Sequence, residues 1–189
     1  TQNVLTQIMR LQQICLGHLT DDAGETHLLK SNRMNELLDI LDEIQGNAII
    51  WATWTRDIRS IAEALRDRFS VQAVAMLHGE TPGSERQKIV ESFQDRSSEL
   101  RFLVGHPRTG GFGLTLTAAT TVIYYSNSYD LELRMQSEDR AHRIGQENKV
   151  TYIDLISPGT IDEKIVSALR NKIKIADTIL GEDVRDWLK

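Results

Sequence analysis

The side chains best suited to act on a triphosphate lie between residues 136 and 146, which read QSEDRAHRIGQ. Gln136, Arg140 and Arg143 are spaced i, i+4 and i+7, so a helix through them would present an amide and two guanidinium groups on one face. Two fixed cations suit a phosphoryl group that gains negative charge during transfer, and arginine donates two hydrogen bonds from a planar fork. The same spacing also permits ordinary surface ion pairs: Asp139 with Arg143, and Glu138 with His142.

A glycine-rich turn, RTGGFGLTL at residues 108–116, follows the third predicted strand. Its glycines, Gly110, Gly111 and Gly113, allow backbone N–H groups to approach an anion closely. A short helix after them would add its positive N-terminal end. The alternative is a tight strand-to-helix turn that needs glycine only for its geometry.

Short apolar runs alternate with amphipathic stretches, which is typical of a parallel sheet with crossover helices. We predict strands at residues 48–51, 73–77, 101–105, 121–125 and 150–156. Helices are expected near residues 4–15, 34–44, 58–69, 131–143 and 161–180, with another starting at Pro82. A flexible link is expected at residues 17–26 and a surface loop at residues 96–99. The fold class is therefore an open α/β sheet with helices on both faces.

The run at residues 136–146 resembles motif VI of superfamily-two helicase-like ATPases, in the form typical of Swi/Snf-type translocases. The resemblance implies the second, C-terminal RecA-like lobe of such an enzyme. It also implies that Arg140 and Arg143 are arginine fingers that reach ATP on a partner lobe, with Gln136 and Gln146 supporting them. Three parts are expected on this basis: N-terminal helices at 1–45, a RecA-like core at 46–157 and a closing helix at 158–189.

Residues 108–116 resemble motif V of the same family, which touches both the DNA backbone and the nucleotide. The resemblance implies DNA contacts from Thr109 and Gly110, and nucleotide contacts from Gly111 and Gly113. His106-Pro107 stands where the main branch has a Ser-Thr pair, and Thr115 stands where asparagine is usual. The His-Pro variant resembles the bacterial and bacteriophage branch of the family.

Two strand ends resemble the motif IV region. Trp54 matches a tryptophan that could stack on a base or sugar, although half-buried packing is the slightly favoured alternative. At the next strand end His78 replaces the usual aspartate, and Gly79 and Thr81 are the candidates for DNA-backbone contacts. Arg86 also fits the family, and we expect it to form a structural salt bridge.

The sequence lacks other parts of an ATPase site. No Gly-Lys dipeptide occurs, so there is no phosphate loop, and no Asp-Glu pair follows a predicted strand. ATP and Mg²⁺ would therefore be held mainly by an N-terminal RecA-like lobe of the same protein, and this chain alone should not hydrolyse ATP. Double-stranded DNA, contacted through its backbone, is the expected second partner.

Composition is that of a soluble globular domain, with 189 residues, 40% hydrophobic and 26% charged. The net charge of −5 argues mildly against nucleic acid but does not exclude local phosphate contacts. A single cysteine, no apolar run long enough for a membrane helix and no metal-ligand spacing favour an intracellular protein without a metal site of its own. We expect a monomeric, cytoplasmic chain, or a nuclear one if the source is eukaryotic.

Three alternatives remain open from the sequence. The chain could be a non-catalytic interaction module, with its arginines engaged only in ion pairs. It could be a self-contained nucleotide-binding domain that uses the glycine-rich turn. Within the family, the enzyme could separate strands instead of translocating on duplex DNA.

Overall fold

The computed structural model describes residues 3–79, 81–109 and 114–180, with side chains described as far as residue 173. Its centre is a five-stranded sheet in the order β4-β5-β3-β6-β7, and every neighbouring pair is parallel. The strands are β3 (Asn47–Trp51), β4 (Val74–Leu77), β5 (Phe102–Gly105), β6 (Ala119–Tyr124) and β7 (Thr151–Asp154). All five predicted strands are confirmed.

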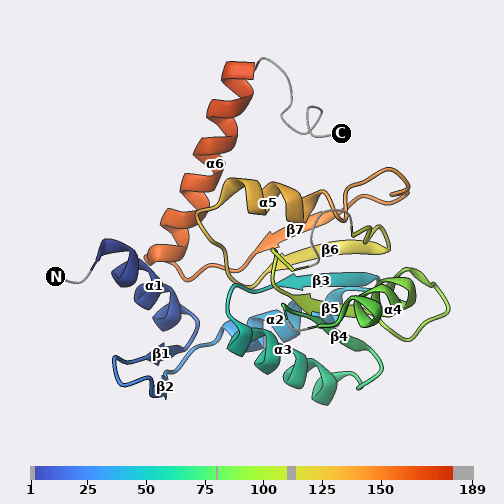
Figure 1. Cartoon of the computed structure of the whole chain (residues 1–189), viewed down its shortest axis with the longest axis horizontal. Coiled ribbons are helices and arrows are strands. Elements are labelled where there is room, and N and C mark those ends of the chain that lie inside the picture. Colours follow the sequence, from blue (N-terminus) through green and yellow to red (C-terminus); the bar gives the residue numbers. More distant parts are fainter. Residues whose placement is uncertain (1–2, 80, 110–113, 181–189) are drawn as a thin grey trace.

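Helices surround this sheet (Figure 1). They are α1 (Val4–Cys15), α2 (Arg33–Glu43), α3 (Thr55–Arg68), α4 (Gly83–Gln94), α5 (Leu131–Glu138) and α6 (Ile161–Leu180). Pro82 occupies the N-cap position of α4, and the Thr160 hydroxyl accepts a hydrogen bond from the N–H of Asp162 in the first turn of α6. None of the described helices is long and apolar enough to cross a membrane.

Two clusters of buried apolar residues lie on opposite faces of the sheet. In β3, Ala48 and Ile50 belong to one cluster, whereas Ile49 and Trp51 belong to the other. This alternation follows from the two-residue period of a strand. Helices α2 and α3 contribute to the first cluster, and Phe93 of α4 contributes to the second. Both faces are therefore covered, which explains why β5 is buried along its whole length and β3 along all but its first residue.

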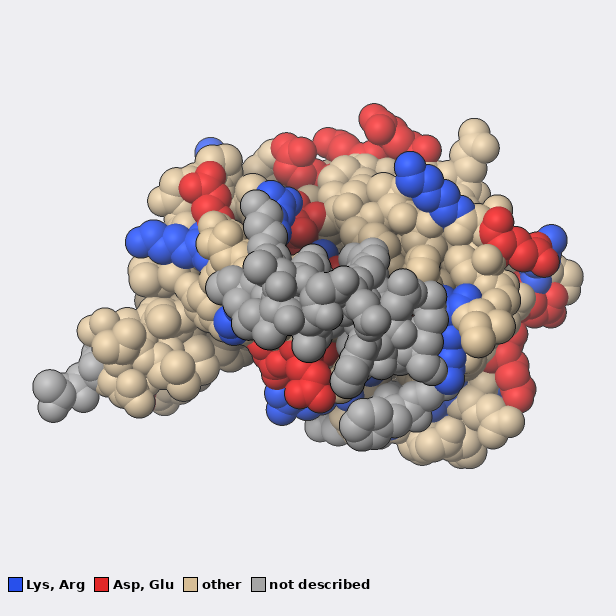
Figure 2. Space-filling model, turned by 90° about the horizontal axis from the view of Figure 1, so that it is seen from above, with Lys and Arg blue, Asp and Glu red and all other residues tan. Residues whose placement is uncertain are grey.

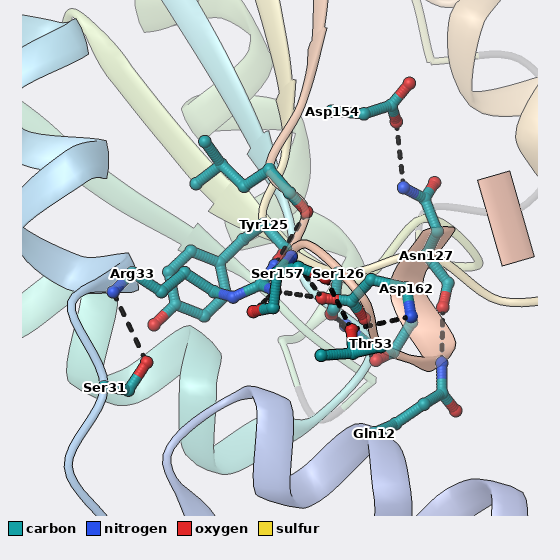
Figure 3. Close-up of polar contacts among 12 residues, drawn as sticks. Gln12, Ser31, Arg33, Thr53, Tyr125, Ser126, Asn127, Asp154, Ser157 and Asp162 are labelled. Carbon is teal, nitrogen blue, oxygen red and sulfur yellow. Dashed lines mark hydrogen bonds and ion pairs between the residues drawn. The ribbon is translucent and has the colours of Figure 1, made fainter. Parts of the chain in front are cut away.

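Arg33, at the start of α2, bonds to the start of α6 and to the main chain that follows two strands of the sheet (Figure 3). It donates to the carbonyl oxygens of Tyr125 (2.6 Å) and Leu155 (2.7 Å), and it pairs with the Asp162 carboxylate at the start of α6. The side chain is buried, and the Ser157 hydroxyl accepts a further hydrogen bond at 3.0 Å. One guanidinium group therefore ties two helix starts to the ends of β6 and β7.

The predicted flexible link at residues 17–26 is wrong. Residues 18–28 form an antiparallel hairpin of β1 (His18–Thr20) and β2 (Thr26–Leu28). The Asp21 carboxylate accepts hydrogen bonds from the N–H groups of Ala23 and Glu25, both at 2.9 Å, and so closes the turn.

Two helix predictions around the candidate site are also wrong. The helix expected at residues 131–143 ends at Glu138, and residues 114–118, expected to begin a short helix, have no helical structure. The two segments meet through a tertiary hydrogen bond, in which the Leu116 N–H donates to the Arg140 carbonyl oxygen at 2.8 Å. The two segments are tied to each other rather than continuing as separate helices.

A buried acid lies beneath the hairpin. The Asp57 carboxylate of α3 is 3.1 Å from Nε2 of His18, and both side chains are buried. Burial raises the pKa of Asp57 to about 7, opposed by the nearby guanidinium groups of Arg33 and Arg56. Burial, together with Arg56, lowers the pKa of His18.

Asp57→Asn should change the dependence of stability on pH. Because the folded state holds a proton that the unfolded carboxyl has already lost, the stabilisation from Asp57 disappears as pH rises through about 7. The free energy of unfolding of the native protein, relative to Asp57→Asn, should fall by about 1 kcal/mol between pH 6 and pH 8 in urea titrations. Asp67→Asn, which removes an exposed carboxylate from the same helix, is the control; a difference that rises with pH would contradict the assignment.

Candidate functional site

The predicted site residues follow the carboxyl ends of several strands, which meet at one edge because the sheet is parallel. Trp54 follows β3, Gly79 and Thr81 follow β4, and Thr109 follows β5. Gly110, Gly111 and Gly113 lie outside the described residues. The close packing of this edge depends on Gly105 at the end of β5, where a Cβ would lie 2.5 Å from the Leu77 carbonyl oxygen.

Arg140 is buried at this edge. Its Nη1 donates to the Thr109 carbonyl oxygen at 2.9 Å, and its guanidinium carbon lies 5.4 Å from the centre of the Trp51 ring. Among the described residues, no carboxylate forms an ion pair with it. Burial lowers its pKa, opposed by Tyr124. The structure thus links motif VI directly to the turn of motif V.

Arg143 is exposed, and its Nη1 donates to the Thr115 hydroxyl at 3.3 Å. Gln136 remains on α5, where its amide donates to the Glu132 carboxylate at 2.9 Å. The prediction that Gln136, Arg140 and Arg143 share one helical face is therefore wrong, because the helix ends before either arginine.

Gln146 braces the end of motif VI. Its amide nitrogen donates to the carbonyl oxygens of Thr117, Ala119 and Ala141, all at 2.9–3.0 Å, and its amide oxygen accepts from the N–H of Asn148. Ala119 begins β6, so Gln146 lies toward the amino edge of the sheet. The Gln146 side chain therefore holds these main-chain groups together, and its expected support of the two arginines stays a prediction.

A pocket of about 320 Å³ brings together residues from three strand ends. It is lined by Thr55, Ile58, His78, Gly79, Arg86, His106, Arg108 and Thr109. Two arginines and two histidines are present, and none of these described lining residues is acidic. Burial lowers the pKa of His106, as do the nearby charges of Arg108 and Arg140, which favours the neutral imidazole. The positive charge of the pocket therefore comes from its two arginines. The pocket is suited to an anion.

Gly79 and Thr109, two of the candidates for contacts with the DNA backbone, line this pocket. Thr81, a third candidate, does not. The Thr81 hydroxyl accepts from the N–H of His78 at 3.2 Å and is buried. Arg86 donates to the carbonyl oxygens of Thr81 (2.7 Å) and Gly79 (3.0 Å). The predicted salt bridge of Arg86 is wrong, since its described partners are main-chain carbonyl groups that shape the loop.

Trp54 packs against the core. Its indole nitrogen is buried without a hydrogen-bond partner among the described atoms, and its ring meets that of His18 edge to face at 6.4 Å. These contacts favour the packing alternative over stacking on a base.

Sequence reasoning did not assign to the site the arginines and histidines that line the pocket, Arg86, Arg108, His78 and His106. His78 and His106 had been noted only as departures from the family pattern, although each follows a buried strand. Outside this edge, the ligand atoms of Asp21, Glu25 and His27 gather within 4.8 Å on the exposed hairpin. The Asp21 carboxylate already closes the hairpin turn, so this group has an ordinary structural explanation.

Comparison with known proteins identifies the family. The model for the helicase conserved C-terminal domain matches residues 30–145. The chromatin-remodeling ATPase INO80 is 36% identical over 157 residues in Mycosarcoma maydis (82% of this chain, 8% of that protein) and 34% identical over 163 residues in Homo sapiens (86% and 10%). The putative ATP-dependent helicase/translocase YwqA of Bacillus subtilis is 31% identical over 190 residues (98% and 20%).

The chain thus spans between 8% and 20% of the length of these relatives. Among solved structures, the crystal structure of the C-terminal part of the Fun30 ATPase domain matches with a TM-score of 0.68 and 26% identity, covering 74% of this chain and 46% of that one. The chain belongs to the helicase C-terminal domain family and has the RecA-like fold of the C-terminal lobe of Swi/Snf-type proteins.

Proposed function

We propose that this lobe supplies arginine side chains to ATP bound by another domain and holds the backbone of double-stranded DNA in the cationic pocket. The observation that carries the proposal is the position of Arg140, which bonds to Thr109 where Thr109 also lines the pocket. The nucleotide-facing segment and the candidate DNA-facing segment are therefore in direct contact.

Arg143 is the residue proposed to reach the phosphates, because it is exposed and its planar fork can donate two hydrogen bonds. Arg140 completes the pair from a buried position, where it also keeps the Thr109 turn in place. Gln136, on α5, is proposed as a supporting donor.

ATP with Mg²⁺ fits this chain only in part. Two guanidinium groups can stabilise charge on a transferring phosphoryl group, but the sequence has no phosphate loop to cradle the triphosphate. Bound ATP would supply the phosphoryl group whose transfer to water releases free energy. We assign the binding of ATP to the N-terminal lobe of the same protein. This chain would add the contacts of its two arginines when the two lobes close on the nucleotide.

The pocket reconciles DNA binding with the acidic total charge. Basic and acidic side chains are interspersed over the face drawn in Figure 2, whereas two arginines, Arg86 and Arg108, converge in the pocket. Contacts with phosphates depend on such local charge and carry no sequence information. The proposed grip is therefore independent of DNA sequence.

Arg143→Ala in the full-length enzyme should reduce kcat for ATP hydrolysis by about a thousand-fold or more, because the finger stabilises charge that develops only in the transition state. DNA affinity, measured by fluorescence anisotropy, should remain within about three-fold. Arg170→Ala, an exposed arginine on α6, is the matched control. Undiminished turnover by Arg143→Ala would refute the finger role.

The isolated 189-residue chain should show no DNA-stimulated ATP hydrolysis and should bind ATP only weakly in calorimetric titrations. The reason is that a finger without cradle, lysine and metal cannot organise phosphoryl transfer. Robust hydrolysis by the pure chain would overturn the proposal of a divided site.

Arg108→Gln in the full-length enzyme should weaken binding to duplexes of unrelated sequence to the same extent. Since one phosphate contact is lost, the slope of log K against log salt concentration should decrease by about 0.9. Arg96→Gln, another exposed arginine with an acidic partner, should leave the slope unchanged. Equal slopes for Arg108→Gln and the native enzyme would exclude Arg108 from the interface.

A further inference from the structure

Arg134 on the inner face of α5 joins the ends of two strands to the segment that carries the arginine pair. Its Nε donates to the Glu138 carboxylate at 2.7 Å, and its Nη1 pairs with the Asp154 carboxylate at the end of β7. The same Nη1 donates to the Asn127 amide oxygen at 2.8 Å. The guanidinium carbon lies 3.4 Å from the centre of the Tyr124 ring, so both its edges and its face are engaged.

The partners of Arg134 are themselves fixed. Asn127 donates to the Asp154 carboxylate at 2.8 Å, and its carbonyl oxygen accepts from Gln12 of α1 at 2.8 Å (Figure 3). Tyr124 shares a hydrogen bond of 2.6 Å with Ser137, one residue before Glu138. The contacts come from α1, β6 and β7, so α5 is placed against the rest of the fold and not only against its own turn.

Glu138 transmits this placement to the arginines. Its carbonyl oxygen accepts from the N–H groups of Ala141 and His142, both at 3.0 Å, and from the Tyr152 hydroxyl at 3.3 Å. The turn containing Arg140 is therefore organised on one carbonyl group, in a residue whose side chain Arg134 holds. Gln146 closes the other end of the same segment through the Ala141 carbonyl.

The charges around Arg134 are poorly solvated. The side chains of Arg134, Glu138 and Asp154 are 11%, 10% and 17% exposed. Loss of the guanidinium would leave two carboxylates near each other with little water to screen them. Such acids would separate or seek new partners, and the turn that depends on Glu138 would shift.

We propose that Arg134 is a positioning residue that sets the geometry of Arg140 and Arg143 for ATP hydrolysis through Glu138. The inference rests on the proposed function of the two arginines. Arg134 touches neither nucleotide nor DNA in this scheme. Its planar fork is required because a lysine, as a point charge, cannot satisfy Glu138, Asp154 and Asn127 together.

The test uses the full-length enzyme with Arg134→Met and Arg134→Lys. Arg134→Lys keeps the positive charge between the two acids, so it remains informative if Arg134→Met does not fold. Both variants should lower kcat for DNA-stimulated ATP hydrolysis by about ten-fold or more, with KM for ATP and DNA affinity each within about two-fold. Arg68→Lys and Arg68→Met are the matched controls, because Arg68 of α3 forms an exposed ion pair with Asp42 of α2.

A second arm separates positioning from general support of the fold. In an Arg143→Lys background, where turnover is already impaired, Arg134→Lys should lower kcat by less than about two-fold, because the geometry that it sets is no longer used. The inference would be overturned if Arg134→Lys lowered kcat by the same factor in both backgrounds. It would also be overturned if the single Arg134 variants folded and kept kcat within two-fold of the native value. If Arg143→Ala itself keeps full turnover, the proposed function fails; if Arg143→Ala loses turnover while the Arg134 variants keep it, only this inference fails.

Discussion

Parallel pairing of the five strands is the constraint on which the site depends. It brings the ends of β3, β4 and β5 to one edge, so that residues separated by dozens of positions line a single pocket. The apolar strands tolerate this arrangement only because helices cover both faces. The polar groups at the strand ends must then be satisfied locally, by side chains or by neighbouring turns.

Three buried or half-buried polar side chains meet this need, and each bonds to the main chain or to fixed partners. Arg33 donates hydrogen bonds to carbonyl groups that follow β6 and β7. Arg134 pairs with carboxylates at the ends of β7 and α5. Gln146 donates to carbonyl groups just before and at the start of β6. Each replaces hydrogen bonds that regular structure cannot supply at an element boundary. The segment that carries Arg140 and Arg143, proposed to contact the nucleotide, lies between Arg134 and Gln146.

The layout of the sheet could be predicted because apolar runs such as that of β3 and the helical periodicity of α3 are local signals. The end of α5 could not. The spacing of Gln136, Arg140 and Arg143 fits a helix, but the helix ends at Glu138. The Arg140 carbonyl oxygen accepts from the Leu116 N–H instead, a contact across 24 residues that local spacing does not reveal. Family resemblance identified Arg140 and Arg143 as candidate arginine fingers, whereas the pocket was missed because no single strand end reveals that His78 and His106 converge.

Burial of Arg140 has an electrostatic consequence of its own. Its described contacts are a carbonyl dipole and an aromatic ring, which compensate a full positive charge less completely than a carboxylate would. In such a poorly solvated position the remaining field is weakly screened, so an anion that approaches is attracted more strongly than by an arginine at the surface. The buried guanidinium group thus leaves a positive electrostatic potential at the edge where phosphates would bind.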